Sequence, residues 1–416
     1  MREEEIKEVS LKENCCSIQY GYTQSASEEK VGPKFLRITD IQDKIINWQS
    51  VPYCKINEED YKKYKLVDGD ILIARTGAST GTNAIYREGM PDAVFASYLI
   101  RLKVNSRYIP RFVYYFLQSP IYKEHIESII GGSAQPNANA QQLTDIPIPL
   151  FPLPEQRAIA SILGSLDDKI ALNRQMNATL EAIGQALFAR WFVDFEFPDG
   201  EGKPYRSSGG ETVETELGEV PRGWRVGTLG EFCDIIMGQS PPGTTYNEIG
   251  DGLPFYQGIT DFGFRFPSRR VYCTAPTRFA EEGDVLLSVR APVGSLNVAE
   301  ERCAIGRGVA ALRLKKKQHR YLYYLLCATQ SGWNKFEAEG TVFGSVNKAD
   351  VNDFKVILPS ETLRNNFGSL MEPLDKQIMN NEKQSRTLTT IRDALLPKLM
   401  SGEIRVDTEV KNETMG

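Results

Sequence analysis

Hydrophobic residues follow two different patterns along this chain, and the two patterns alternate. In residues 1–152 and 216–360, β-branched and aromatic residues are dense and are interrupted by glycine and proline at the spacing of strands and turns. In residues 153–195 and 361–404, apolar residues recur instead at intervals of three and four, the period of a helix that buries one stripe. A glycine-rich linker, 196–215, and a tail, 405–416, complete the chain. The pattern predicts an α+β protein of two sheet domains and two long helices.

The sheet segments also contain shorter helical stripes. Between Arg111 and Ile129, apolar residues fall on one helical face at Phe112, Tyr115, Phe116, Ile121 and Tyr122. We therefore expect each domain to be a curved β-sheet with one short helix packed on it.

The second half of the chain repeats the first at a shift of 208 residues. Leu166-Asp167-x-x-Ile170-x-x-Asn173 falls on Leu374-Asp375-x-x-Ile378-x-x-Asn381, and ten of the 36 positions from 153 to 188 are identical at this shift. Upstream the shift drifts by a few residues, so that 69–73 corresponds to 283–287. Self-similarity on this scale indicates duplication.

The two helices are predicted to pack on each other as an antiparallel coiled coil. Their seams comprise Ile159, Ile162, Leu166, Ile170, Leu180, Ile183 and Leu187, and Phe367, Leu370, Leu374, Ile378, Leu388, Ile391 and Leu395. Asn173 and Asn381 interrupt both seams, and a buried asparagine at such a position fixes register. Packing of each helix on its own domain remains the alternative.

An antiparallel pair would relate the repeats by an internal pseudo-twofold axis. A helix of about 35 residues is roughly 50 Å long, whereas recognition modules one DNA turn apart need about 34–36 Å between them. We therefore expect the helices to hold the two domains apart at a fixed distance.

Composition narrows the class of protein without identifying it. No apolar run approaches the length of a membrane span, and the charged start, residues 1–6, lacks the apolar core of a signal peptide. The seven cysteines lack metal spacing, which is typical of reduced thiols. We expect a cytoplasmic protein that contacts no membrane.

The net charge of −5 does not by itself favour a nucleic-acid partner. Basic residues nevertheless cluster locally, at Lys62, Lys63 and Lys65, at Arg265, Arg269 and Arg270, and at Lys315 to Lys317 with Arg320. Each cluster is equally well explained as a solvated face.

The sequence contains no recognisable catalytic arrangement. A phosphate-binding G-x-x-x-x-G-K-[ST] motif is absent, and His125 and His319 have no ligand pattern around them. Residues 198–203 imitate a nuclease signature, but its carboxylates and lysine fall within six residues of the linker instead of on adjacent strands. We expect neither an enzyme nor a cofactor or metal.

Four loops carry side chains that are suited to reading DNA bases, because guanine pairs with arginine and adenine with asparagine or glutamine. The first domain offers Arg75, Thr76 and Ser79, and then Gln135, Asn137 and Asn139; the second offers Arg290 and Ser295, and then Ser345, Asn347 and Lys348. Glycines in these loops would let the backbone approach DNA closely. Ordinary tight turns and unselected drift remain alternatives.

Three motifs resemble a known family. Leu153-Pro154-Glu155-Gln156-Arg157-x-Ile159 with Arg190-Trp191-Phe192-Val193-Asp194-Phe195, Glu216-Leu217-Gly218-Glu219-Val220-Pro221-x-Gly223-Trp224, and Arg392-Asp393-x-Leu395-Leu396-Pro397-Lys398-Leu399 are similar to motifs of type I restriction-modification specificity subunits. The first domain departs from the family because it lacks the Pro-x-Gly-Trp motif.

The resemblance implies two target-recognition domains on a helical pair, reading an asymmetric double-stranded DNA site in two parts. It also implies two adenine-methylating methyltransferase subunits and nuclease-translocase subunits as partners. We expect the methyltransferase subunits to dock on outward apolar residues of the first helix, namely Leu163, Leu172 and Met176. A coiled-coil adaptor that binds only proteins is the competing hypothesis.

Overall fold

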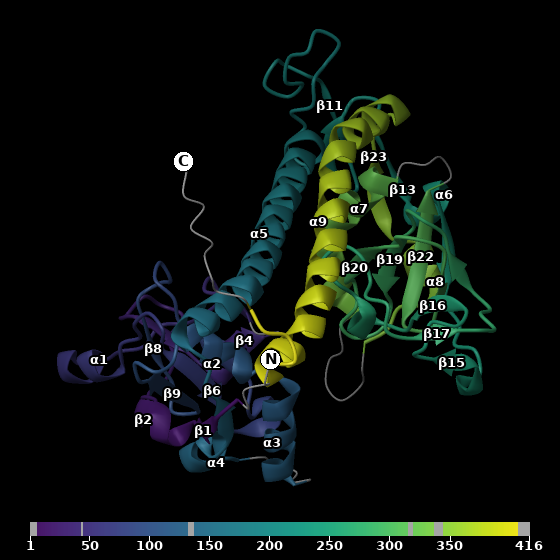
Figure 1. Cartoon of the computed structure of the whole chain (residues 1–416). Helices are drawn as coiled ribbons and strands as arrows, with labels where there is room; N and C mark the ends of the chain where they lie inside the picture. Colours follow the sequence, from purple (N-terminus) through teal and green to yellow (C-terminus); the bar gives the residue numbers. More distant parts are fainter. Residues whose placement is uncertain (1–5, 43–44, 132–136, 315–318, 337–343, 407–416) are drawn as a thin grey trace, which may run out of the picture. The chain divides into compact units, whose positions relative to one another are not determined.

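The computed structural model describes residues 6–42, 45–131, 137–314, 319–336 and 344–406. Contacts divide the chain into two compact units. The first comprises residues 1–171 and 385–416, and the second comprises residues 172–384. Helices α5 (Leu153–Phe192) and α9 (Glu361–Ser401), drawn in teal and yellow in Figure 1, each contribute one part to each unit.

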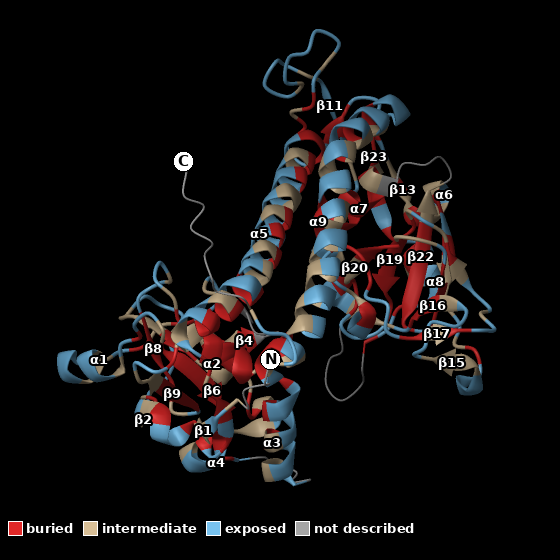
Figure 2. Cartoon of the chain, viewed as in Figure 1, coloured by how far each residue is buried: buried red, intermediate tan, exposed pale blue. Residues whose placement is uncertain are grey.

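The main sheet of the first unit has four antiparallel strands in the order β2 (Cys15–Tyr20), β9 (Leu99–Val104), β6 (Ile71–Ala74) and β7 (Asn83–Ile85). Three smaller pairs accompany it: β1 (Glu8–Ser10) with β10 (Pro147–Pro149), β3 (Lys34–Leu36) with β8 (Ala93–Phe95), and β4 (Ile41–Gln42) with β5 (Ile45–Ile46). The helices are α1 (Glu58–Tyr64), α2 (Pro110–Phe116), α3 (Pro120–Ile130) and α4 (Ala140–Thr144). Figure 2 shows β6 and α2 in red, at the centre of this unit's core.

The helix that was predicted from Arg111 to Ile129 is in fact two helices. Pro120 begins α3, and the hydroxyl of Ser119 accepts a hydrogen bond from the Tyr122 backbone N–H at 3.4 Å. Proline fits the first turn of a helix but not its interior, so the chain breaks after α2. Ile121, which was assigned to the buried stripe, is 43% exposed.

The main sheet of the second unit has the order β14 (Cys233–Met237), β22 (Val309–Leu314), β19 (Val285–Ser288) and β20 (Leu296–Val298). A second sheet comprises β15 (Tyr246–Asn247), β17 (Tyr272–Cys273), β16 (Leu253–Tyr256), β21 (Cys303–Ile305) and β18 (Phe279–Ala280). Two pairs remain, β13 (Arg225–Thr228) with β23 (Lys355–Leu358) and β11 (Thr212–Thr215) with β12 (Gly218–Pro221). The helices are α6 (Leu229–Phe232), α7 (His319–Ala328) and α8 (Lys348–Asn352).

The main sheets of the two units have the same strand order and the same register. In the first unit Ile71 of β6 lies opposite Leu102 of β9. In the second unit the corresponding residue of β19, Val285, lies opposite Leu312 of β22. The predicted α+β fold with a duplicated sheet domain is therefore confirmed.

The long helices pack on each other and run antiparallel, as predicted. In the second unit Asn173 donates to the Gln384 side chain at 2.9 Å, and the rings of Phe188 and Phe367 lie 5.5 Å apart, so residue numbers rise along α5 as they fall along α9. In the first unit Arg392 contacts Asp167 at 2.7 Å.

Both predicted seam asparagines are buried. Asn173 and Asn381 are 0% and 3% exposed, and Asn381 donates to the Asn177 side chain at 2.8 Å. Asn177, which was not predicted, also donates to Glu382 at 3.1 Å. Together with Gln384 these residues form the polar cluster, which fixes the register of the two helices in the second unit.

Other parts of the predicted seams are wrong. Four assigned residues lie on the surface, with exposed fractions between 37% and 51%: Ile162, Ile183, Leu370 and Ile391. Leu163, which was expected to face outward, is instead 0% exposed within the core of the first unit. The predicted seams are therefore right at Ile159, Ile170, Phe367 and Ile378, which are buried, and wrong at these four surface positions.

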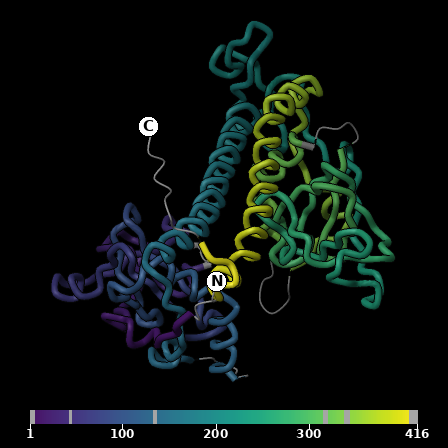
Figure 3. The backbone as a smooth tube through the Cα atoms, in the orientation of Figure 1, coloured from purple at the N-terminus to yellow at the C-terminus, as the bar shows by residue number. Residues whose placement is uncertain are grey.

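The end of α9 and the start of the chain belong to the same unit (Figure 3). Gly402 adopts a φ of +76°, a left-handed backbone conformation that favours glycine, and it lies beside the Ile6 side chain. Beyond it, Arg405 forms a double hydrogen bond with Glu155, with both distances 2.7 Å. Across the described residues, no helix combines the length and the apolar character needed to cross a bilayer.

Candidate nucleic-acid interface

In the first unit, the loop after β6 meets the segment that precedes α4. Thr76 and Asn137 form an antiparallel bridge, and the Ala138 N–H donates to the Arg75 carbonyl at 2.8 Å. The structure thus brings together Arg75, Thr76 and Asn137, which lie about 60 positions apart in the sequence. Gln135 lies outside the described residues.

The charge of Arg75 has no carboxylate partner in the described part of its unit. Its guanidinium lies over the ring of Tyr20, 5.1 Å from the ring centroid, and it forms no ion pair with any residue that the structure describes. The exposed Asn137 flanks it. Sequence reasoning missed Tyr20, because a tyrosine at the end of a strand carries no distinctive signal.

Two other residues that were predicted to read DNA, Asn139 and Ser79, support the backbone of these two segments. The Asn139 side chain accepts a hydrogen bond from the Gln142 N–H at 2.8 Å and caps α4. Ser79 donates its hydroxyl to the Thr76 carbonyl at 3.4 Å. Gly77 has a φ of +71° and open space beside it, so this turn can approach a ligand closely.

The second unit builds the same bridge from different residues. Arg290 pairs with Ser345, and the Val346 N–H donates to the Val289 carbonyl at 3.0 Å. Both Arg290 and Ser345 are exposed. Arg290 lines a hollow of about 330 Å³ together with Met237, Val289, Arg307, Gly344, Ser345 and Val346.

Of the remaining predicted residues of the second unit, Asn347 and Ser295 support the backbone and Lys348 is exposed. Asn347 caps α8 by accepting hydrogen bonds from the N–H groups of Ala349 and Asp350, at 2.8 and 3.1 Å. Ser295 lies where β20 begins, and its N–H donates to the Ser288 hydroxyl at 2.8 Å.

The two arginines of these loops are not equivalent. The bond from Ala138 to Arg75 and the bond from Val346 to Val289 occupy the same place in their units, so Val289 corresponds to Arg75 and Arg290 corresponds to Thr76. Successive side chains of an extended chain point to opposite faces. Each loop therefore presents its arginine from a different position.

Arg307, which sequence reasoning missed, is a third exposed arginine of this kind. It lines the hollow beside Arg290, and neither of the two forms an ion pair within the described part of the chain. A signal was available, because Gly306-Arg307-Gly308 places an arginine and nearby glycines at a strand end, as Arg75-Thr76-Gly77 does.

The predicted basic clusters are largely neutralised by carboxylates of their own units. Lys62 pairs with Glu58, Lys65 with Asp92, Arg269 with Glu301 and Arg270 with Asp261. Lys315 to Lys317 lie outside the described residues. These clusters therefore offer less free charge than the sequence suggests.

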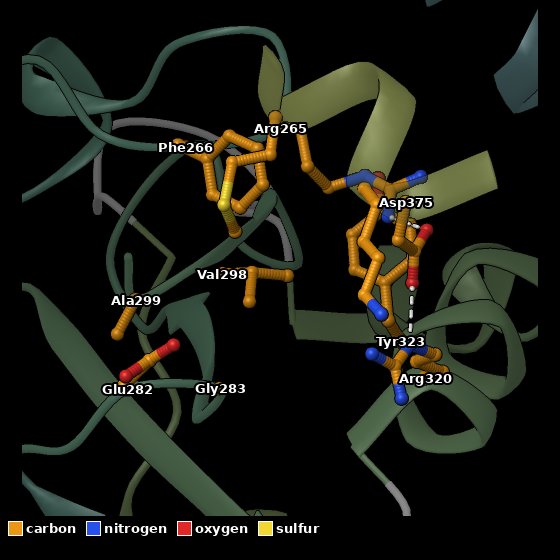
Figure 4. Close-up of a pocket in the computed structure, with 11 residues that line it drawn as sticks. Arg265, Phe266, Glu282, Gly283, Val298, Ala299, Arg320, Tyr323 and Asp375 are labelled. Carbon is orange, nitrogen blue, oxygen red and sulfur yellow. Dashed lines mark hydrogen bonds and ion pairs between the residues drawn. The ribbon is translucent and has the colours of Figure 1, made fainter. Parts of the chain in front are cut away.

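Arg265 belongs to a buried ionic network of the second unit. Its side chain is 3% exposed and contacts Glu181 of α5, Asp375 of α9 at 2.9 Å and the Tyr324 hydroxyl of α7 at 3.2 Å. Figure 4 shows Arg265 and Arg320 around Asp375, beside a hollow of about 340 Å³. Burial disfavours the charged guanidinium, but Tyr323, Glu181 and the other facing groups hold the pKa of Arg265 well above its ordinary value.

The first unit uses the corresponding aspartate in the same way. The Tyr115 hydroxyl of α2 donates to Asp167 of α5 at 2.7 Å, and Arg392 of α9 donates to the other oxygen at 2.7 Å. The repeated Leu-Asp motif therefore anchors each sheet domain to the helices through a tyrosine or arginine partner.

No residues of the described part of the chain form a group of histidine, cysteine, aspartate or glutamate that could hold a metal ion. His125 directs its Nε2 atom at the Gln142 carbonyl, 2.8 Å away. The loops that carry Arg75 and Arg290 offer guanidinium groups, which bind through charge and forked hydrogen bonds.

Comparison with known proteins identifies the family. The model of the type I restriction modification DNA specificity domain matches residues 3–182 and 221–389. A Methanocaldococcus jannaschii chain that is named as the MjaX specificity subunit of a type I restriction enzyme is 31% identical over 414 residues, which cover 97% of this chain and 94% of the relative. The HindI specificity subunit of Haemophilus influenzae is 24% identical over 410 residues, covering 82% of this chain and 88% of that protein.

Among solved structures, the type I restriction-modification S subunit from M. genitalium has a TM-score of 0.56 at 18% identity, covering 96% of this chain and 98% of that one, and it supports the fold. Two copies of the family's domain in one chain, with α5 and α9 packed together, agree with the duplicated architecture. The chain therefore belongs to the family of type I restriction-modification specificity subunits, which are not themselves catalytic.

Proposed function

We propose that this chain reads an asymmetric, bipartite site on double-stranded DNA, with one half read by each sheet domain. The observation that carries the proposal is the pair of matched loop bridges, Thr76 with Asn137 and Arg290 with Ser345, each presenting an arginine without an ionic partner among the described residues. Identical scaffolds with different side chains at their tips are what two different half-sites require.

The charges support this proposal although the net charge is −5. Many cations are already paired with carboxylates of their own unit, as in Arg269 with Glu301. Arg75, Arg290 and Arg307 have no such partner among the residues that the structure describes, and a guanidinium without a carboxylate partner can bind either phosphate or guanine. The residues that cap α4 and α8, Asn139 and Asn347, keep the loop backbones in place and have a smaller share in reading.

The test is an exchange of domains followed by methylation mapping in a host. Replacing residues 1–152 with the corresponding domain of a relative should change one half of the methylated site and leave the other half unchanged. A change in both halves would contradict the assignment of one half-site to each domain. Absence of salt-dependent retention on duplex DNA would instead favour the adaptor hypothesis.

We further propose that the helices bind two methyltransferase subunits, with nuclease-translocase subunits completing the complex. Two copies of one partner need the same surface twice. The exposed apolar residues occur in repeat-related pairs, Ile162 with Leu370 and Ile183 with Ile391, which differ by 208 positions. Leu172, 48% exposed, and the half-buried Met176 remain candidates, whereas the buried Leu163 does not.

Glutamate at these positions should remove partners one at a time. Ile162→Glu with Ile391→Glu alters only the first unit, and Ile183→Glu with Leu370→Glu alters only the second. Native mass spectrometry of each variant with the methyltransferase should show one bound copy instead of two. Ser161→Glu with Ser369→Glu, at neighbouring exposed positions, is the matched control. Two bound copies in both apolar variants would contradict the proposal.

A further inference from the structure

The hollow beside Arg290 combines an apolar floor with a cationic rim. Val289 and Val346 are buried at its floor and Met237 is half-buried there, while Arg290 and Arg307 are both exposed. Its volume is about 330 Å³, which is large enough to admit the edge of a base pair.

Backbone hydrogen bonds identify what stands at the same positions in the first unit. The Gly238 N–H donates to the Val309 carbonyl, and the Gly21 N–H donates to the Leu99 carbonyl in the first unit. Gly238 therefore corresponds to Gly21, and the preceding residue Met237 corresponds to Tyr20. The Val289 N–H donates to the Gly308 carbonyl, and the Arg75 N–H donates to the Tyr98 carbonyl in the first unit. Gly308 therefore corresponds to Tyr98, and Arg307 corresponds to Ser97.

The two units therefore differ at four aligned positions. Where the first has an arginine stacked on an aromatic ring, the second has methionine and valine. Where the first has Thr76 and Ser97, the second has Arg290 and Arg307. The second unit thus has an apolar surface at the place where the first has its cation, and it carries its own cations at the rim.

DNA offers one apolar group that suits such a floor. In the major groove, the C5-methyl group of thymine is the largest apolar feature of a base edge, and guanine presents the two acceptors that bind a guanidinium fork. A floor of methionine and valine between two arginines is complementary to a thymine beside a G·C pair.

We propose that this hollow is a reading pocket for a thymine methyl group, and that Arg290 and Arg307 bind guanine in the adjoining base pair. The inference rests on the proposed function, because it assumes that the second domain reads DNA. It adds Met237 and Arg307 to the residues that determine specificity.

The test uses the full chain assembled with its methyltransferase and a duplex that carries the mapped site. Each thymine of the second half-site is replaced in turn by deoxyuridine, which removes only the methyl group. One replacement should weaken binding about fourfold, the factor expected for one buried methyl group. In the Met237→Ala complex the same replacement should have no further effect. If no thymine adjoins a G·C pair, or if every deoxyuridine duplex binds like its parent, the inference is wrong.

Arg307→Ala provides a second measurement. It should weaken binding of the mapped duplex by about 5- to 150-fold, the range for a lost bidentate base contact, and should weaken binding of a duplex with a scrambled second half much less. Equal losses on both duplexes would assign Arg307 to phosphate and overturn its role. Arg302→Ala, whose guanidinium is paired with Glu281 at 3.5 Å, is the control. If the unaltered complex fails to distinguish the mapped from the scrambled duplex, the proposed function itself fails.

Discussion

Arg75 and Arg290 are the two arginines among the predicted base-reading residues, and neither has an ion-pair partner in the described part of the chain. Arg75→Ala and Arg290→Ala should each cost about 1–3 kcal/mol on the cognate half-site, measured by competition binding on duplex DNA. Arg269→Ala, which removes an exposed but ion-paired arginine, should change affinity little. An equal loss on every sequence would show that these arginines contact phosphate.

Cysteine reactivity provides a further prediction at the scale of single residues. Burial raises the pKa of the Cys54 thiol to about 11 and that of Cys303 to about 12, so very little reactive thiolate exists at pH 8. Cys16 is exposed. Iodoacetamide at pH 8 should alkylate Cys16 first in the native protein, with the buried thiols reacting only after denaturation or as the pH approaches their pKa values. Peptide mass spectrometry over time checks this order, and rapid labelling of Cys54 in the native state would contradict it.

At the scale of elements, Arg265 joins one helix of the sheet domain to both long helices. Arg265→Ala would leave the carboxylates of Glu181 and Asp375, 12% and 16% exposed, without this cation, although Arg320 would still pair with Asp375. Such a loss typically costs about 3–5 kcal/mol of unfolding free energy, measurable by urea denaturation. Arg270→Ala, whose side chain is 55% exposed, is the control and should cost less than about 1 kcal/mol. Similar stabilities for the two variants would mean that the network does not anchor the domain.

The elements also show how far the sequence can be interpreted. The long helices, their mutual packing and the buried asparagines followed from periodicity, because a 40-residue amphipathic pattern is a strong signal. The face of each helix was harder to assign. Each helix buries residues against its own sheet domain as well as against its partner, so Leu163 is buried while Ile162 is exposed. A single period cannot separate two adjoining buried surfaces.

The site was predictable only in part, for a related reason. An arginine at the end of a strand, followed within four residues by a glycine, located Arg75 and Arg290 in the sequence. The bridge that gives Arg290 the position of Thr76 depends on strand register, which a local motif does not encode. Tyr20 and Met237 enter the site only because the sheet aligns their strands with these loops.

At the scale of the whole molecule, we predict that the helices set the length of the unread spacer between the half-sites. The units divide after Ala171 on α5 and after Gln384 on α9. One heptad inserted at each point therefore leaves the contacts within both units intact, including the polar cluster. Seven residues add about 10 Å of helix, and DNA advances about 3.4 Å per base pair, so the spacer should lengthen by at most about three base pairs.

Methylation mapping of the insertion variant reports the spacer directly. The bases read should not change, because the recognition loops are untouched. Four inserted residues serve as a comparison, since they disturb the heptad phase and should impair activity. An active heptad variant with the original spacer would show that the helices act only as an attachment surface.

The two anchoring aspartates have a consequence for how such genes can exchange parts. Asp167 receives its arginine from the opposite long helix, at position 392, whereas Asp375 receives Arg265 from its own sheet domain. The counterpart of Arg392 in the first helix is Gly184, where a Cβ atom would lie 2.3 Å from the Tyr324 hydroxyl. Recombination that moves a second sheet domain between genes therefore moves Arg265 with it. It also moves Tyr324, so the first helix of the recipient must have glycine at position 184. Viable mosaics should therefore keep position 184 with the second domain and position 392 with the first, even where the crossover falls elsewhere.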